Sequence, residues 1–294
     1  MTRRALLLLA VLALVWGATW PIMKVAVLGL EPWTFRTYCG VLGGIGMLCV
    51  ARMNGHRLMM APDQLRLAVL IAPFSLGGWF VFSALGVGLM GSGRAAIIAY
   101  TMPLWAMIFA RLLLKESLTP ARIISLAAGL CGLAVLLSHD FGLIEDSPMG
   151  AAFMVMAALV WGLGTVLFKR ATWREPLSVI VAWQLIAISV PVTIMALLTE
   201  KLFPAAGIWT WLALAYNVVL STVVGYYVWN RIVLLLPTGA AVIGSMAVPI
   251  TGVMFGTLLL GEEIGWREII ALALIAGAIT VVMLEKPKLK GAPA

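Results

Sequence analysis

The chain has 294 residues and a formal net charge of +8, and 63% of its residues are hydrophobic whereas only 11% are charged. Because soluble domains carry about 25% charged residues, this composition excludes a water-soluble globular protein and indicates a chain that folds in a lipid bilayer. The basic residues are scattered in short clusters and form no single patch, so nucleic acid is not expected as a partner.

Ten uncharged apolar runs follow one another along the chain, and each is long enough to form most or all of a transmembrane helix. A bilayer core about 30 Å thick needs about 20 helical residues, and a helix satisfies its own backbone hydrogen bonds in lipid. The runs do not alternate polar and apolar residues as barrel strands do. The sequence therefore predicts an all-α integral membrane protein with ten transmembrane helices. In chain order, the runs occupy residues 5–23, 37–51, 67–93, 95–110, 123–138, 147–168, 176–199, 202–230, 232–261 and 269–284.

The first run follows the basic start "MTRR" and has small residues near its end, a pattern shared with cleavable signal peptides. However, residues 13–24, "ALVWGATWPIMK", are nearly repeated at residues 158–169 as "ALVWGLGTVLFK". Because a segment in mid-chain cannot be a leader, we expect the first run to be a transmembrane helix of the mature protein.

Two further pairs of segments echo each other at nearly the same separation. "EPWTF" at residues 31–35 matches "EPLSV" at 175–179. "MPLWAMIFARLLLKESLTPARII" at residues 102–124 matches "VPITGVMFGTLLLGEEIGWREII" at 248–270. The echoes therefore predict two repeats of five helices each.

The predicted repeats are residues 1–144 and 145–294, which together form one transport domain. Because five is an odd number, the second repeat enters the membrane from the opposite side, and the two repeats have inverted topology. The change of charge between the matched positions Arg122 and Glu268 agrees with this inversion. Inverted repeats are typical of secondary transporters, in which the halves exchange conformations to open a cavity to either side.

The orientation follows from the basic residues, because short cytoplasmic loops are enriched in Lys and Arg. With the N-terminus in the cytoplasm, ten helices place fifteen of the 20 Lys and Arg residues on the cytoplasmic side. We therefore expect a multi-pass protein of the cell inner membrane with both termini in the cytoplasm.

Several motifs resemble those of the drug/metabolite transporter superfamily, EamA family. They are "VWGATWP" in the first run, "EPWTFR" before the second, and "LLLKESLT" and "LLLGEEIG" after the fourth and ninth. Within the family, the chain is most similar to the YddG-type exporters of aromatic amino acids and paraquat. The resemblance implies a ten-helix bundle with a central cavity lined by helices 1, 3, 4, 6, 8 and 9.

The acidic residues all lie in loops or at helix ends, so the chain lacks the midplane carboxylate that ion-coupled carriers often use. It also lacks a phosphate-binding loop with a Lys and any set of His and Cys residues at metal-ligand spacing. We therefore expect no metal, no cofactor and no enzymatic activity. The three Cys residues lie inside apolar runs and predict no disulfide framework.

Trp and Tyr residues lie deep in the runs that would line the cavity, together with small polar residues. Buried Trp and Tyr need partners for their N–H and O–H groups, and aromatic rings can hold a ring-bearing or cationic solute. Plain packing or lipid contact is the alternative interpretation of each ring. The predicted substrate-binding residues are Trp16, Trp20, Trp79, Ser83, Tyr100, Thr101, Trp161, Thr165, Asn217, Ser221, Tyr227, Ser245 and Met246.

Four further residues have predicted roles. Pro103 and Pro249 each remove a helical hydrogen bond, and we expect them to be hinges for the movement of helices 3, 4, 8 and 9. Lys24 and Arg36 lie near the outer ends of the first two helices. Either they extend to the membrane interface, or one of them meets a substrate carboxylate or pairs with Glu31.

The predicted function is the export of small organic solutes, namely amino acids with aromatic or neutral side chains and organic cations. The solute would occupy a central aromatic cavity that opens alternately to the two sides. A carrier of another metabolite, such as a vitamin, nucleotide or nucleotide sugar, is an alternative, although a phosphate-bearing cargo would require more basic residues in the cavity. A membrane assembly protein that transports nothing is the second alternative. Both a monomer and a homodimer are compatible with the sequence.

Overall fold

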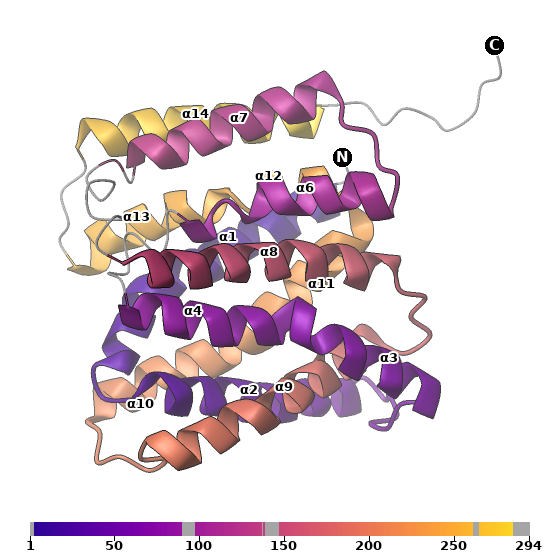
Figure 1. Cartoon of the computed structure of the whole chain (residues 1–294), viewed down its shortest axis with the longest axis vertical. Helices are drawn as coiled ribbons and strands as arrows, with labels where there is room; N and C mark the ends of the chain where they lie inside the picture. The colour runs from indigo at the N-terminus through magenta and orange to yellow at the C-terminus, as the bar shows by residue number, and fades with distance from the viewer. Residues whose placement is uncertain (1–2, 90–97, 137, 139–146, 261–264, 285–294) are drawn as a thin grey trace.

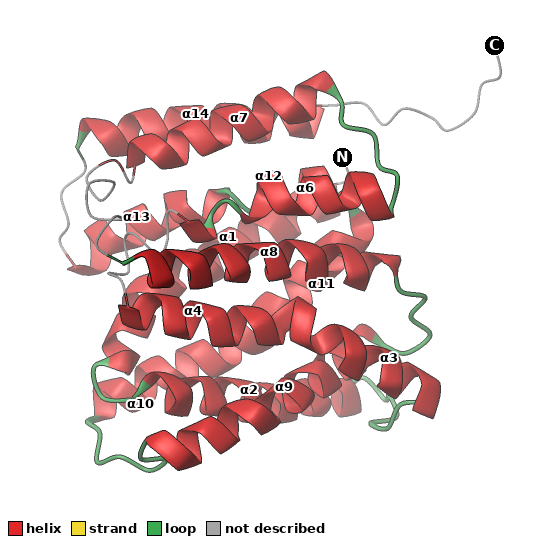
Figure 2. Cartoon of the chain, in the orientation of Figure 1, coloured by secondary structure: helices red, strands yellow, loops and turns green. Residues whose placement is uncertain are grey.

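The computed structural model describes residues 3–89, 98–136, 138, 147–260 and 265–284, and their regular elements are all helices (Figures 1 and 2). The first half contains α1 (Arg3–Val27), α2 (Pro32–Met53), α3 (Pro62–Ala72), the π-helical segment η1 (Pro73–Gly77), α4 (Gly78–Leu89), α6 (Met102–Leu113) and α7 (Pro120–Leu136). The second half contains α8 (Pro148–Arg170), α9 (Leu177–Thr199), α10 (Ile208–Tyr216), the π-helical segment η3 (Asn217–Val224), α11 (Gly225–Leu235), α12 (Thr238–Gly244), α13 (Ala247–Leu260) and α14 (Trp266–Leu284).

Seven helical segments of the described residues are long and apolar enough to cross a membrane. They are Arg3–Val27, Pro32–Met53, Pro62–Gly86, Pro148–Arg170, Leu177–Thr199, Ile208–Leu235 and Thr238–Phe255. Three shorter apolar helices, Met102–Leu113, Pro120–Val135 and Ile269–Val282, lie at the positions of the fourth, fifth and tenth predicted runs. The prediction of an all-helical, multi-span fold is confirmed, whereas the count of ten crossings stays a prediction, because these three helices are shorter than a full span.

The helices pack in a pattern that repeats between the two halves. At one edge of the bundle α7 lies along α14, and at the opposite edge α2 lies along α9 (Figure 1). Between these edges, α1 packs against α10, η3, α11 and α13, while α8 packs against η1, α4 and α6. Each central helix therefore contacts elements of the other half, and the two matching sets of contacts surround α1 and α8.

Departures from regular α-helix also occur at matching places. The segment η1 joins α3 to α4, and η3 joins α10 to α11. Two short breaks precede α6 and α13. In the first break Thr101 N–H donates to Ile98 O at 3.1 Å, and in the second Met246 N–H donates to Ile243 O at 3.1 Å. These tight turns, with bonds three residues apart, end one helix and begin the next.

Close approach of helices explains why the "VWG" motif occurs twice. A Cβ atom at Gly17 would lie 2.1 Å from Thr251 Oγ1 on α13, and one at Gly162 would lie 2.8 Å from Ala106 N on α6. Only glycine fits where helix backbones come this close. The repeated Trp-Gly pair therefore places a Trp side chain beside each of two tight helix crossings.

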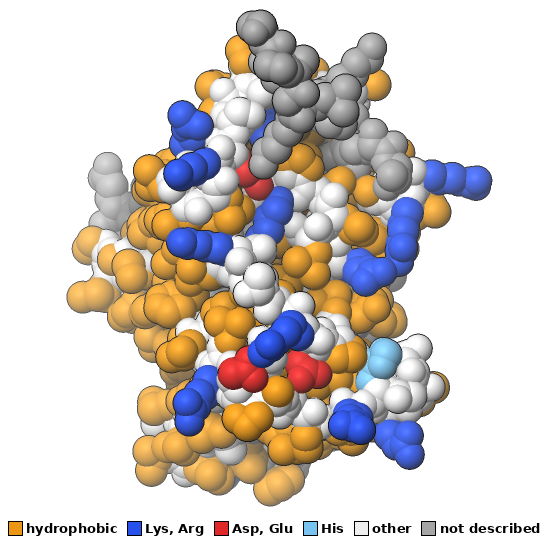
Figure 3. Space-filling model, turned by 90° about the vertical axis from the view of Figure 1, so that its right-hand side faces the viewer, with side chains coloured by type: hydrophobic (Ala, Val, Ile, Leu, Met, Phe, Trp, Pro, Cys, Tyr) orange, Lys and Arg blue, Asp and Glu red, His pale blue; other side chains and the backbone are white. Residues whose placement is uncertain are grey.

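A partly buried ion pair joins the two halves at one end of the bundle. Glu116, in the loop between α6 and α7, accepts hydrogen bonds from Lys169 Nζ at 3.0 Å and from Thr238 Oγ1 at 2.9 Å. Glu116 Oε2 also accepts the backbone N–H of Thr238 at 2.9 Å and so caps the start of α12. Figure 3 looks onto this end of the molecule, where many Lys and Arg side chains and few carboxylates lie.

Candidate functional site

Aromatic side chains from α1, α4, α8 and α11 meet in the interior of the bundle. Trp161 on α8 is at the centre and is only 5% exposed. Its ring centroid lies 5.5 Å from that of Trp79, 6.0 Å from Trp16, 6.1 Å from Tyr226 and 5.9 Å from Trp229. These separations are typical of interacting rings. We call these five residues the aromatic cluster.

The local sequence of α11 and η3 explains how Trp16 enters this cluster. A Cβ atom at position 225 would lie 2.2 Å from Trp16 Nε1, so Gly225 leaves the space that the indole occupies. The backbone N–H of Gly225 donates to Leu220 O, five residues back. The wide turn leaves the carbonyl of Ser221 available, and Ser221 O accepts the Trp16 Nε1–H at 3.1 Å.

The Nε1–H of Trp161 is buried and has no hydrogen-bond partner among the described residues. Other partly buried indoles are satisfied: Trp105 donates to Thr101 Oγ1 at 3.2 Å, and Trp183 donates to Leu58 O at 2.8 Å. A buried donor without a partner is unfavourable. The centre of the aromatic cluster therefore holds a buried donor that the described protein groups leave unpaired.

A basic side chain lies next to the cluster. The guanidinium of Arg36 on α2 is 4.8 Å from the ring centroid of Phe80, and its Nη2 donates to Ser83 Oγ at 3.3 Å. Phe80 in turn lies 6.4 Å from the ring of Tyr226. Arg36 does not pair with Glu31, whose Oε2 accepts the backbone N–H of Lys201 at 3.2 Å, and the side chain of Lys24 lies outside the described residues.

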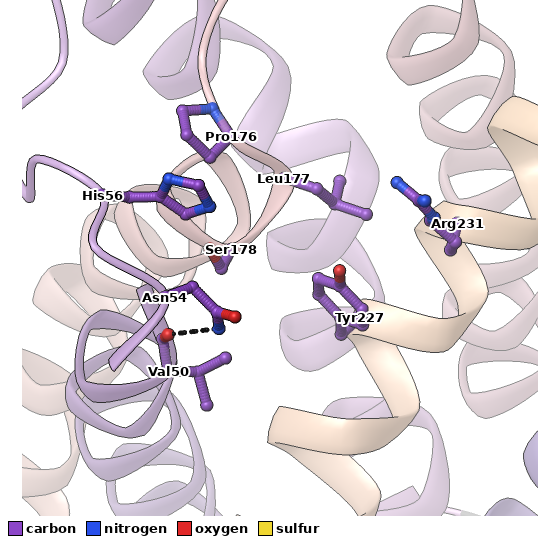
Figure 4. A pocket seen from close by; sticks show the side chains of 8 residues that line it. All are labelled: Val50, Asn54, His56, Pro176, Leu177, Ser178, Tyr227 and Arg231. Carbon is purple, nitrogen blue, oxygen red and sulfur yellow. Dashed lines mark hydrogen bonds between the residues drawn. The ribbon is translucent and has the colours of Figure 1, made fainter. Parts of the chain in front are cut away.

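A pocket of about 310 Å³ lies between the end of α2, the start of α9 and the first two turns of α11 (Figure 4). Tyr227 and Arg231, one turn apart on α11, face it from one side, and His56 and Ser178 face it from the other (Figure 4). No carboxylate is among the described residues that line it, which are Val50, Asn54, His56, Pro176, Leu177, Ser178, Tyr227 and Arg231. Since Tyr227 follows Tyr226 in the chain, this polar pocket is adjacent to the aromatic cluster along α11.

The structure brings only some of the predicted substrate-binding residues together. Trp16, Trp79 and Trp161 lie in the aromatic cluster, and Thr165 donates to the carbonyl of Trp161 at 2.9 Å. Ser83 is bonded to Arg36 as described above, Ser221 contributes its carbonyl, and Tyr227 lines the pocket. The side chain of Trp20 lies outside the described residues.

The other predicted residues lie apart from the cluster. Tyr100 and Met246, beside the two helix breaks, share a separate buried group with Leu133 and Ile275 of α7 and α14. The polar side chains of the remaining three bond to nearby backbone carbonyls: Thr101 to Ile98, Asn217 to Ala213 and Ser245 to Val242. The predicted hinges Pro103 and Pro249 follow the breaks as the second residue of α6 and the third of α13.

Sequence reasoning missed Tyr226, Trp229 and the position of Arg36. Tyr226 and Trp229 are three residues apart and so share a face of α11, which is a detectable signal. Tyr227 is predicted instead, as a polar residue of the same run as Asn217 and Ser221. The wide turns of η3 change the rotation of α11 relative to α10. Among the described residues, no three His, Cys, Asp or Glu side chains form a group that could hold a metal ion.

The apolar helices define a multi-span helical membrane protein. The model of the EamA-like transporter family matches residues 3–138 and 148–284, and the chain therefore belongs to this family. The predicted family is thus confirmed.

The chain is 26% identical over 270 residues to "Uncharacterized transporter YoaV" of Bacillus subtilis (strain 168), with 90% of this chain and 92% of the relative covered. It is 26% identical to "Uncharacterized inner membrane transporter YedA" of Escherichia coli (strain K12), with 94% and 89% covered. It is 22% identical to a "Probable amino-acid metabolite efflux pump" of Salmonella typhimurium, with 96% and 95% covered. A solved crystal structure, 22% identical, has the same fold with a TM-score of 0.85 over 97% of this chain and 98% of the other.

Proposed function

We propose that the chain is a secondary transporter of the cell inner membrane that exports small organic solutes. The solutes are amino acids with aromatic or neutral side chains, and organic cations are a second class. The observation that carries this proposal is the aromatic cluster around Trp161, whose buried Nε1–H has no partner among the described residues. Such a site provides ring faces for an apolar or cationic group and a donor for a polar one.

The proposed mechanism is alternating access by two inverted five-helix repeats, residues 1–144 and 145–294. The two stretches matched by the family model support it, as do the matching contacts of α1 and α8. The breaks before α6 and α13 support a hinge in each half, because tight turns interrupt the regular helical bonds there. Movement of the halves about these breaks would open the aromatic cluster to one side at a time.

The proposed topology has ten crossings and both termini in the cytoplasm. The beginning of α1 and the end of α14 lie at the same side of the bundle (Figure 1), which supports an even number of crossings. The Lys and Arg side chains at the end seen in Figure 3 support a cytoplasmic location of that end.

The nature of the solute is inferred from the site and from one relative. That relative is named as a probable amino-acid metabolite efflux pump. Aromatic rings dominate the interior site, and they suit a ring-bearing or apolar body better than a phosphate-bearing one. We therefore propose that this chain is an exporter of the YddG type, whose solutes are aromatic amino acids and paraquat.

The test uses purified protein in liposomes loaded with labelled phenylalanine, tryptophan, leucine or paraquat. We expect efflux faster than from protein-free liposomes, and we expect the Trp79→Ala and Trp161→Phe variants to be slower. Trp209→Ala is the matched control, because Trp209 is 73% exposed at the start of α10 and lies outside the site. Equal rates with and without protein for all four solutes would refute the proposal, and efflux of a nucleotide sugar instead would favour the alternative metabolite carrier.

A further inference from the structure

The direction taken by the Arg36 side chain points to a ligand. Arg36 is the fifth residue of α2, so its backbone lies about 6 Å from the start of that helix. Arginines this close to a helix end usually extend outward to the membrane interface. The Arg36 side chain instead extends inward, because its guanidinium contacts Phe80 and Ser83, which are 2% and 4% exposed.

The guanidinium is only partly satisfied by the protein. Arg36 is half-buried and forms no ion pair with a carboxylate of the described residues. Ser83 Oγ accepts one of its five N–H donors, and the ring of Phe80 covers one face of the guanidinium. An ionised side chain inside a transmembrane bundle that lacks an opposite charge marks a functional site.

The fold itself does not require a cation at this position. The match between "EPWTF" and "EPLSV" aligns Arg36 with Ile180 in the other half. Ile180 is only 1% exposed and belongs to the main apolar core, so the equivalent place in the second half is filled by an aliphatic side chain. Of these two matched positions, only the one in the first half carries a positive charge. The interior site is therefore basic on the side of α2 only.

We propose that Arg36, oriented by Ser83, binds the carboxylate of the transported solute while the adjacent aromatic cluster holds the rest of the molecule. The planar guanidinium fork matches the two oxygens of a carboxylate. The rings of Phe80 and Tyr226 connect this anchor to Trp161, since their centroids follow at 6.4 Å and 6.1 Å. The substrate class is thus a monocarboxylate with an aromatic or bulky apolar body, such as a zwitterionic aromatic amino acid.

This inference rests on the proposed transport function and narrows it. A fixed cation beside the rings repels a cationic solute, so the anchor favours amino acids over the organic cations that were proposed as a second class. The test compares phenylalanine with phenethylamine, which has the same ring and amine but lacks the carboxylate. In proteoliposomes, Arg36→Gln should slow the transport of phenylalanine about tenfold or more, as expected for the loss of a charge-assisted hydrogen bond. The transport of phenethylamine should be unchanged or faster.

Three further variants complete the experiment. Arg36→Lys should keep the preference for phenylalanine over phenethylamine, because it keeps the positive charge. Ser83→Ala should weaken this preference about two- to fivefold, because it removes the hydrogen bond that orients the Arg36 guanidinium. Arg267→Gln is the matched control, since Arg267 also lies over an aromatic ring, at 5.1 Å from Trp266, but at the start of α14. It should transport both compounds at the wild-type rates.

The outcomes separate this inference from the transport function on which it rests. A general defect of folding would slow both compounds, whereas the anchor predicts that their rates change in different ways. Equal loss of both compounds in Arg36→Gln and in Ser83→Ala, or no loss of either, would overturn the carboxylate anchor while transport stands. A wild-type protein that moves neither compound would overturn the proposed function and the anchor with it.

Discussion

Glu116 connects three separate parts of the chain, and its replacement by glutamine tests whether this contact stabilises the bundle. The carboxylate accepts the Lys169 ammonium at 3.0 Å and the hydroxyl and N–H of Thr238 at 2.9 Å each. The side chains of Lys169 and Glu116 are 19% and 18% exposed, so the pair is mostly shielded from water. Glutamine keeps the shape of the side chain but removes the charge that faces Lys169.

The expected cost follows from these contacts. A hydrogen bond to a charged group contributes about 1.5–3 kcal/mol, and loss of a helix cap costs about 0.5–2 kcal/mol. Glutamine can still accept one hydrogen bond from Thr238, and the residual exposure weakens the ion pair. We therefore expect Glu116→Gln to lower the free energy of unfolding by about 2–3 kcal/mol in total. For a chain of this size, that corresponds to a fall in the melting temperature of about 3–5 °C.

The assay is thermal unfolding of the purified protein in detergent, followed by fluorescence. Asp63→Asn is the matched control, because Asp63 also pairs with a basic residue, Arg174, but their side chains are 58% and 70% exposed. This control should change the melting temperature by about 1 °C or less, since exposed ion pairs contribute little. A Glu116→Gln protein that melts within about 1 °C of the wild type, or a control that falls as far, would refute this reasoning.

Three other experiments test the proposed hinges, a tight helix crossing and the charge of the pocket. Replacing Pro103 and Pro249 together with alanine should slow transport in proteoliposomes without reducing the amount of inserted protein, because continuous helices would stiffen the two breaks; unchanged rates would refute the hinge. Gly164→Ala should lower the melting temperature by several degrees, because its Cβ would lie 2.0 Å from a carbonyl oxygen of η1. Gly277→Ala is the control and should be neutral, because the space around Gly277 is open. Equal melting temperatures of the two variants would contradict this reasoning. Arg231→Gln should slow the entry of carboxylate-bearing solutes from the pocket side and leave phenethylamine unaffected, and equal effects on both would exclude an electrostatic role for this pocket.

The sequence predicted the class of fold because hydrophobicity and backbone hydrogen bonding leave few choices in lipid. The uncharged runs became helices, and the repeated Trp-Gly pairs at Trp16 and Trp161 marked the tight crossings of α1 and α8. Within several runs the prediction of one regular helix is too simple. The third and eighth contain π-helical segments, and the ninth is divided at Ser245 and Met246.

These irregularities explain why the composition of the site could be predicted only in part. A wide turn rotates the helix that follows it, so the regular helical period cannot be carried from α10 across η3 into α11, where Tyr226 joins the aromatic cluster and Tyr227 lines the pocket. Arg36 could be placed near the end of a helix from its position in the chain. The inward course of its side chain depends on Phe80 and Ser83, which come from a different helix.

The amino-acid sequence alone determined the lipid environment, the helical class and the family, because each follows from local composition, run length and motifs. Only the tertiary structure decided which aromatic rings meet, which indole N–H lacks a partner, and which cation lies beside them. Those properties depend on helix rotation and on distances between segments about 145 residues apart, such as Trp16 and Trp161, and no local pattern in the chain specifies them.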